Sequence, residues 1–482
     1  MTTLLARFDD WSDRLSPIMV KEIRQMVRAR EFNYSLGASL VVGMLVAFIG
    51  LADAANATGT SGSRVFVALM VCLSLLGLVV IPLGAFSTLR NERADQTLEL
   101  ITQTTLSPRR IVVGKLLTQW VKLATLFAGL APFITMSFLL GGIDLLTILI
   151  ALTVLFMWSM WMCAASLFLS SASESRTMTA VFFVGMLIAF LWILATGAPL
   201  IFIAGAGIPS ASSFSGIFWG LAASTALCFT SMANFVLLAE NRLALAIEDR
   251  STALRVGFLI QFLLIVACTV GPTIAGAPGY TKTGALEALG IFGGLHLTLT
   301  AVFAITEDMT LSRRVFRRIQ KSLKRPWLAL FRPGGGRGAQ WILIQMVILL
   351  VAGLFTDTSQ FRWLGAICCY ILFFTGVPTA ILRNLLPASK SKYLRAAILL
   401  FFPIAALSAD ILQYVLNPSN GIGGTFSAYH ILNPFRALAN WPEVESNGWQ
   451  VRTLILGLLG LLAYLDLYWL GWREDKRAAA QN

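Results

Sequence analysis

The chain has 482 residues, of which 57% are apolar and only 13% are charged, and its mean hydropathy is +0.76. Soluble domains carry about 25% charged residues, so this composition excludes a water-soluble protein. The six cysteines all lie in apolar runs, which argues against a disulfide-stapled secreted fold. We therefore expect an all-α integral membrane protein.

Charge-poor stretches of about 20 residues, enough to cross a bilayer as a helix, recur along the whole chain. We predict twelve such spans in two halves of six. The first six are Ser35 to Ala52, Val65 to Phe86, Thr118 to Leu140, Leu145 to Ser170, Ala180 to Gly205 and Gly216 to Leu238. The second six are Val256 to Gly276, Ala285 to Ile305, the short Gln340 to Phe355, Phe361 to Leu382, Ala396 to Leu416 and Thr453 to Trp472.

The lysines and arginines predict the orientation of these spans. With the N-terminus inside, 31 of the 37 basic residues lie in inside segments, and Lys122 lies in a span. Only five lie outside, namely Arg64, Lys282, Arg362, Arg436 and Arg452. This asymmetry follows the positive-inside rule for an even number of spans with both termini cytosolic. The net charge of +13 therefore reflects membrane topology and not nucleic-acid binding.

The inside segments divide the chain into three parts. Residues 1–34 form a cytosolic N-terminus, residues 35–255 a first half with an inside hairpin at 87–117, and residues 256–482 a second half with a basic inside segment at 306–340. Both halves begin on the same side, so any duplication would be of the parallel kind.

A helix is predicted to start at Ser16-Pro17, because serine caps free N–H groups and proline suits the first helical position. Met19, Ile23 and Met26 share one side of it, and the opposite side is basic. We expect this helix to lie along the inner membrane surface, either as a lipid-bound anchor or as part of a coupling element.

The hairpin between the second and third spans is compact and polar. Its sequence predicts two short helices, the second starting at Ser107-Pro108 and running into the third span. Both ends of the hairpin are fixed to spans, so another protein could push it as a rigid handle.

These two segments resemble the export-type, type-two permease subunits of ABC transporters, and the resemblance covers about the first 255 residues. The interfacial-helix pattern of that family is matched by Pro17, Lys21, Glu22 and Arg24. Its pattern between the second and third spans is matched by Glu92, Arg93, Thr97, Leu98, Glu99, Leu100, Leu106, Ser107, Gly114 and Lys115. Gln96 replaces the usual glycine and Thr105 the usual proline, which bears on the turn geometry.

The resemblance implies a permease subunit of an exporter whose hairpin docks on a separate ATP-hydrolysing subunit in a bacterial inner membrane. The chain itself has no phosphate-binding loop, because the run Gly334 to Gly338 lacks the required lysine and hydroxyl. We therefore expect no cofactor in this chain and assign ATP and Mg²⁺ to the partner subunit.

The basic segment 306–340 contains a predicted helix with Leu311, Val315 and Ile319 on one face and cations around it. Two partners remain open. Anionic lipid would contribute about 1 kcal/mol per basic residue, and the alternative is a second docking site for an ATPase. The sequence also leaves open whether one chain lines the pathway alone or two copies pair as a homodimer.

Few polar groups lie inside the predicted spans. Asp466, His296 and Asn234 are candidate translocation residues, because a carboxylate at bilayer depth costs about 2.5 to 3.5 kcal/mol on insertion scales. Each has a structural alternative: Asp466 lies where it can meet headgroups or a tyrosine, and His296 can be an ordinary interhelical hydrogen bonder.

An intramembrane enzyme is not expected. His296 and His430 are the only histidines, too few for a three-histidine zinc site, so no metal site is predicted. Hydrolase and metalloprotease motifs are absent. The competing function is that of an ATP-independent secondary transporter or a membrane assembly factor, which a requirement for ATP hydrolysis would distinguish from a pump.

Overall fold

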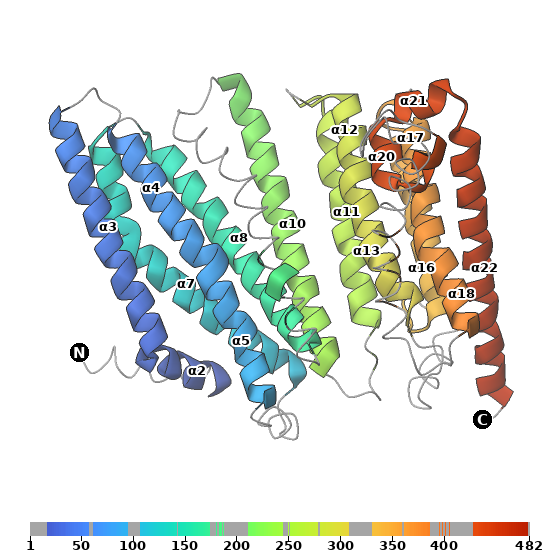
Figure 1. Cartoon of the computed structure of the whole chain (residues 1–482), viewed down its shortest axis with the longest axis horizontal. Coiled ribbons are helices and arrows are strands. Elements are labelled where there is room, and N and C mark those ends of the chain that lie inside the picture. The colour runs from blue at the N-terminus through green and yellow to red at the C-terminus, as the bar shows by residue number, and fades with distance from the viewer. Residues whose placement is uncertain are drawn as a thin grey trace, which may run out of the picture. The chain divides into compact units, whose positions relative to one another are not determined.

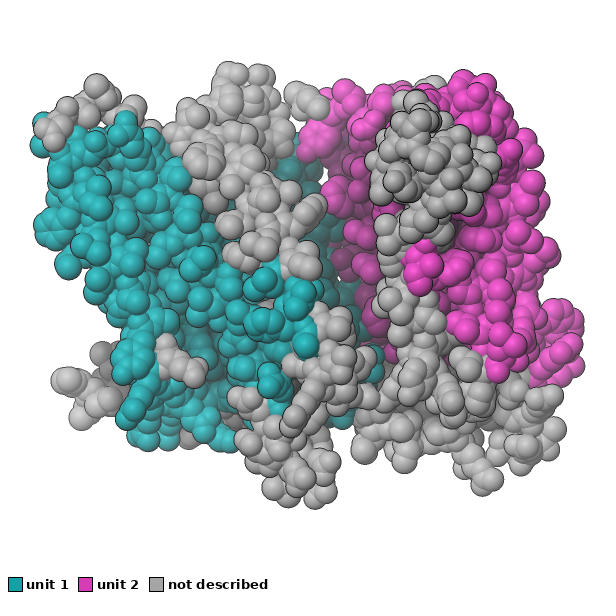
Figure 2. Space-filling view, viewed as in Figure 1, with its two compact units in different colours: residues 1–244 teal, residues 245–482 magenta. Residues whose placement is uncertain are grey.

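A computed structural model of the chain describes residues 17–56, 61–94, 107–141, 143–173, 211–243, 251–277, 280–307, 330–358, 361–385 and 428–480, with isolated positions between some of them. All of these segments are helices, turns or short connections, and the described residues include no strand. The chain divides into two compact units, Met1–Ala244 and Leu245–Asn482, which are coloured separately in Figure 2.

Unit 1 is a bundle of long helices preceded by one short helix (Figure 1). The short helix α2 lies at a steep angle to α3 and packs mainly against α7. The elements are α2 (Pro17–Arg28), α3 (Arg30–Asn56), α4 (Ser61–Leu75), the π-helical turn η1 (Leu76–Val80), α5 (Ile81–Ala94), α7 (Pro108–Leu139), α8 (Leu145–Ala172) and α10 (Ala211–Leu243).

Unit 2 is also helical, with several short elements before its last long helix (Figure 1). Its elements are α11 (Thr252–Ile274), α12 (Lys282–Ala288), the π-helical turn η2 (Leu289–Gly293), α13 (Gly294–Ile305), α16 (Gly335–Gly353), α17 (Phe361–Ile371), the π-helical turn η4 (Leu372–Gly376), α18 (Val377–Leu385), the 3₁₀ turn η7 (Ala428–Leu432), α20 (Pro434–Ala439), α21 (Trp441–Ser446) and α22 (Gln450–Ala480).

Ten helical stretches within the described residues are long and apolar enough to cross a membrane. They are Phe32–Asp53, Ser61–Thr88, Pro108–Leu139, Leu145–Ala172, Trp219–Leu243, Thr252–Ile274, Lys282–Ile305, Gly335–Gly353, Phe361–Leu385 and Gln450–Arg473. Each corresponds to one of the twelve predicted spans. The fifth and eleventh predicted spans, 180–205 and 396–416, lie outside the described residues apart from isolated positions.

The outer faces of these helices are apolar as well as the inner ones. Phe48 and Ile49 on α3 and Leu458 and Leu462 on α22 are all well exposed in the folded chain. A helix that is apolar all round belongs either in a large protein core or in a bilayer, and spanning helices satisfy their own backbone hydrogen bonds there. The protein is therefore a multi-pass helical membrane protein.

Two helix starts and one turn illustrate how the sequence sets these elements. Helix α2 begins at Pro17 and α7 at Pro108, both as predicted, because proline at the first position loses no intrahelical hydrogen bond. The turn η1 comes directly before Ile81-Pro82. Since Pro82 has no N–H to donate, a local change of hydrogen-bond pattern is expected next to it.

The short ninth span begins earlier than predicted. Helix α16 starts at Gly335, inside the glycine run and five residues before the predicted start of the span at Gln340. A Cβ added to Gly338 would lie 2.1 Å from the carbonyl oxygen of Ala304, so the missing side chain lets α16 approach α13 closely. Close packing, and not turn formation, explains this glycine.

Candidate functional site

Three segments of unit 1 meet at one buried lysine, Lys115, in the early turns of α7. Its Nζ atom donates to Oε1 of Glu22, from α2, at 2.7 Å and to Oε1 of Glu92, near the end of α5, also at 2.7 Å. The two carboxylates come from positions 93 and 23 residues away in the sequence. We call Glu22, Glu92 and Lys115 the Lys115 node.

The Lys115 node is held away from solvent. The side chain of Lys115 is 1% exposed, that of Glu22 is 14% exposed and that of Glu92 is 19% exposed. A buried ammonium group loses most of its hydrogen bonds to water, so hydrogen bonds to its carboxylate partners have to replace them. Removing the lysine would leave two carboxylates close together, and the node therefore ties α2 and the end of α5 to α7.

The local sequence explains why Lys115 reaches this position. Ser107 precedes the first turn of α7 and Pro108 begins it, so Lys115 lies two turns further along. Ser107 occupies the capping position, but its side chain makes no capping hydrogen bond. The second predicted helix of the hairpin is therefore the start of α7, continuous with the third span as expected.

Of the fourteen residues that match the two family patterns, Glu22, Glu92 and Lys115 form the node. Helix α2 starts at Pro17, and its residues Lys21 and Arg24 are exposed. Ser107, which precedes α7, is also exposed. Arg93 lies in the last turn of α5, and its side chain is not described. Gly114 is buried in α7. The remaining residues, Thr97, Leu98, Glu99, Leu100 and Leu106, lie outside the described residues.

The apolar side of α2 packs against protein in part. Met26 is buried and Ile23 is half-buried, whereas Val27 is exposed. Arg30 begins α3 and so does not continue the face of α2. Only the exposed part of this helix is free to contact a membrane surface.

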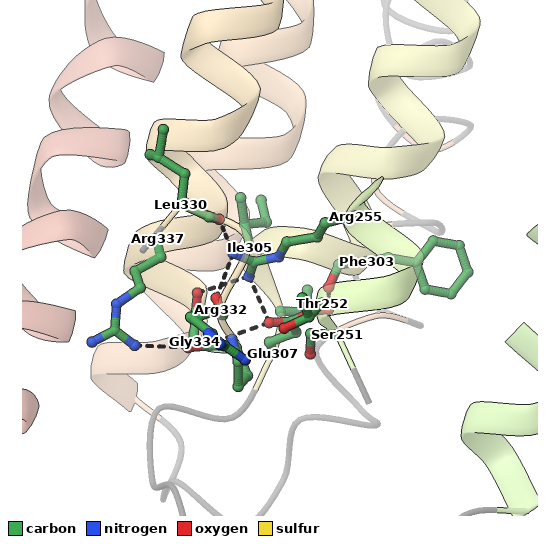
Figure 3. A network of polar contacts seen from close by, with 12 residues as sticks. Ser251, Thr252, Arg255, Phe303, Ile305, Glu307, Leu330, Arg332, Gly334 and Arg337 are labelled. Atoms are coloured by element: carbon green, nitrogen blue, oxygen red, sulfur yellow. Dashed lines mark hydrogen bonds and ion pairs between the residues drawn. The ribbon is translucent and has the colours of Figure 1, made fainter. Parts of the chain in front are cut away.

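Unit 2 contains a second buried cation, Arg255, which sequence reasoning did not single out (Figure 3). Its Nη2 atom donates to Oε2 of Glu307 at 2.6 Å and to the carbonyl oxygen of Gly334 at 3.0 Å. Its Nη1 atom donates to the carbonyl oxygens of Leu330 and Arg332, each at 2.8 Å. One guanidinium thus joins the start of α11 to the chain just after α13 and just before α16.

Further polar contacts surround Arg255. Oε2 of Glu307 also accepts a hydrogen bond from the backbone N–H of Gly334 at 3.0 Å. Arg332 pairs with Asp249 at 3.0 Å, and Asp249 in turn accepts hydrogen bonds from the backbone N–H groups of residues 251 and 252. We call Asp249, Arg255, Glu307, Arg332 and the three carbonyl groups the Arg255 node.

A sequence signal for this node exists. Arg255 is the last charge before one long apolar run and Glu307 is the first charge after another, and a charge at the boundary of a span either reaches the membrane surface or is paired. Nothing in the sequence says which, and only the fold brings the two residues together.

The candidate translocation residues have different surroundings. Asp466, on α22, is half-buried and accepts a hydrogen bond from Nδ2 of Asn384 at 3.4 Å. The partner is thus an amide and not one of the neighbouring tyrosines. Tyr464 is instead buried against Thr375, with their hydroxyl oxygens 2.8 Å apart.

His296 is buried on α13 between two aromatic rings of α11. Its ring centroid lies 6.0 Å from that of Phe258 and 5.9 Å from that of Phe262. Asn234 is buried on α10 in unit 1. Among the described residues no hydrogen bond or ion pair joins His296 to Asp466 directly.

Comparison with family models, with curated proteins and with solved structures gives no match. Within the described part of the chain, no group of three or more histidine, cysteine, aspartate or glutamate side chains is placed to hold a metal ion. The two buried ionic nodes are therefore the arrangements from which function has to be argued.

Proposed function

We propose that the protein is the membrane-spanning permease subunit of an ABC-type exporter, with twelve spans in two halves of six. The observation that carries the proposal is the Lys115 node. Glu22 and Glu92 fall in the two patterns on which the family resemblance rests, and Lys115 holds both at 2.7 Å. Three of the residues that carry the resemblance in sequence thus meet in space.

The node suggests how a push would reach the membrane. Residues 95–106 lie between Glu92 on α5 and Lys115 on α7, and the ion pair joins the two ends of that segment. A separate ATPase that binds and hydrolyses ATP with Mg²⁺ would press on this segment. Because Glu22 shares the same lysine, α2, α5 and α7 would respond together.

The proposal includes a location and an orientation. The distribution of basic residues favours both termini in the cytosol, and the family resemblance implies a bacterial inner membrane. The apolar runs 180–205 and 396–416 would complete the twelve spans. Exposed cations on α2, such as Lys21 and Arg24, suit contact with anionic lipid.

The test is association with an ATPase. Glu92→Ala and Glu99→Lys should each weaken the association with an ATPase that co-purifies with the unaltered chain, and should lower ATP hydrolysis by the reconstituted complex. Glu443→Ala, an exposed residue of α21 on the predicted opposite side, serves as the matched control and should change neither.

Two outcomes would contradict the proposal. Unchanged co-purification and hydrolysis in both variants would remove the hairpin as the docking site. Transport by the purified chain that needs only an ion gradient, with no ATP hydrolysis, would favour the secondary transporter instead.

A further inference from the structure

The two units repeat the same packing pattern. In each unit the first long helix packs against the second and third, and the second packs against the third and fourth. The last long helix packs against the third and fourth. These roles fall to α3, α4–α5, α7, α8 and α10 in unit 1 and to α11, α12–α13, α16, α17–α18 and α22 in unit 2. In both units the second helix contains a π-helical turn, η1 or η2.

The two ionic nodes lie at equivalent places in this pattern. Each node joins the segment at the start of the first long helix, the segment at the end of the second and the segment at the start of the third. In unit 1 these contributions are Glu22, Glu92 and Lys115. In unit 2 the first and second are Arg255 and Glu307, and the third is the backbone from Leu330 to Gly334.

The chemistry of the two nodes is related but not copied. In both, a carboxylate pairs with a cation that is at most 2% exposed: Glu92 lies in the last turn of the second helix of unit 1, and Glu307 lies just after that of unit 2. The cation comes from the third helix in unit 1 and from the first helix in unit 2. Different residues thus make the same connection between the same three segments.

The arginine of unit 2 has a specific task. Four acceptors surround it, one carboxylate and three backbone carbonyl groups, at 2.6 to 3.0 Å. A planar guanidinium presents several donors in a fixed fork, which an ammonium group does not. Without it, the partly buried carbonyl groups of Leu330 and Arg332 would lose this donor, and the carbonyl group of Gly334 would keep the backbone N–H of Gly338.

We propose that Arg255 is the positioning residue of a second coupling node, which gives unit 2 its own mechanical input equivalent to that of unit 1. A force applied to the chain between Glu307 and Leu330 reaches α11, α13 and α16 together, because Arg255 holds both flanks. The connection itself is independent of the partner, whereas its use in transport rests on the proposed function.

The first test measures the connection without any partner. Asp249→Cys and Arg332→Cys, introduced together, replace a pair of side chains in contact at 3.0 Å. The rate at which a short bifunctional thiol reagent bridges them is followed by mass spectrometry in three backgrounds, Arg255, Arg255→Lys and Arg255→Gln. We expect Arg255→Gln to slow bridging by about tenfold, the effect of losing roughly one charge-assisted hydrogen bond, and Arg255→Lys to restore part of the rate.

The control is Arg362→Gln, which removes an exposed pair with Glu445 elsewhere in unit 2 and should leave the bridging rate unchanged. Glu307→Gln keeps the shape of the side chain and leaves Arg255 in place, so it tests the same connection if the arginine variants fail to fold. It should also slow bridging. Equal rates in all backgrounds would overturn the proposal.

The second test measures the mechanical role. In the complex with the ATPase, Arg255→Gln should lower permease-stimulated ATP hydrolysis, and Arg255→Lys should recover part of it. Slower bridging with unchanged hydrolysis would refute the second input. If the unaltered chain binds no ATPase at all, the proposed function fails, while the bridging rates still decide whether Arg255 positions the three helices.

Discussion

Replacing Lys115 with methionine removes the charge at the centre of the Lys115 node and keeps most of the length of the side chain. Oε1 of Glu22 and Oε1 of Glu92 each lie 2.7 Å from the same nitrogen, so they are at most 5.4 Å apart. Two negative charges at that distance repel by about 3 kcal/mol at an effective dielectric constant of 20. Breaking a buried ion pair costs about 3 to 5 kcal/mol. Because both carboxylates are partly exposed and can regain water, we expect a loss of about 3 kcal/mol.

The two carboxylates should be less sensitive than the lysine. Glu22→Gln or Glu92→Gln leaves one cation facing one anion, and each change also removes the repulsion between the carboxylates. We expect each to cost about 1 kcal/mol, the typical value of one hydrogen bond. Combining Glu22→Gln and Glu92→Gln with Lys115→Met should recover most of the stability that Lys115→Met loses, because no uncompensated charge then remains.

Thermal unfolding of the purified protein in detergent, followed by tryptophan fluorescence, ranks these variants by their loss of stability. Arg64→Gln is the matched control, because its ion pair with Asp53 is exposed and should contribute less than about 1 kcal/mol. The reasoning is refuted if Lys115→Met unfolds at the same temperature as Arg64→Gln, or if the added glutamines give no recovery.

Two further predictions concern local structure. A Cβ at Gly460 would lie 2.4 Å from backbone atoms of η4, so Gly460→Ala should destabilise the protein by about 1 to 3 kcal/mol. Gly365→Ala, where a Cβ meets nothing within 4 Å, should leave the melting temperature unchanged or raise it. At the start of α8, hydrogen bonds from the hydroxyl and backbone N–H of Thr147 hold the pKa of Asp144 below its usual value. The stabilisation by this cap is then complete above the ordinary aspartate pKa of about 4 and is lost as pH falls through the lowered one. Asp144→Ala should therefore cost about 1 kcal/mol at pH 7 and clearly less at pH 3; an equal cost at both pH values in thermal melts would contradict this assignment.

The sequence predicted the spanning helices well because their signal is local. Length, apolar composition and proline starts such as Pro17 and Pro108 are all contained within a single segment. The start of α16 was placed wrongly for the opposite reason. Gly338 is needed because Ala304 lies against it, and a contact between two helices leaves no trace in the run of glycines itself.

The candidate site was predictable only in part. The patterns placed Glu22 in the interfacial helix and Glu92 and Lys115 in the hairpin, but the ion pairs join residues up to 93 positions apart and needed the fold. Arg255 was missed because most of its partners are backbone carbonyl groups. Carbonyl groups are present in every residue, so the sequence does not mark the ones that an arginine will bind.

The sharing of Lys115 by α2 and α5 has a consequence for how the chain is made. Glu22 is synthesised 93 residues before the lysine that holds it, which at 5 to 20 residues per second is a delay of about 5 to 20 s. During that interval α2 has no place to dock, and the first two spans enter the bilayer without it. This end of the bundle is therefore complete only when the third span begins to emerge from the ribosome, which makes the N-terminal helix one of the last parts of that end to settle.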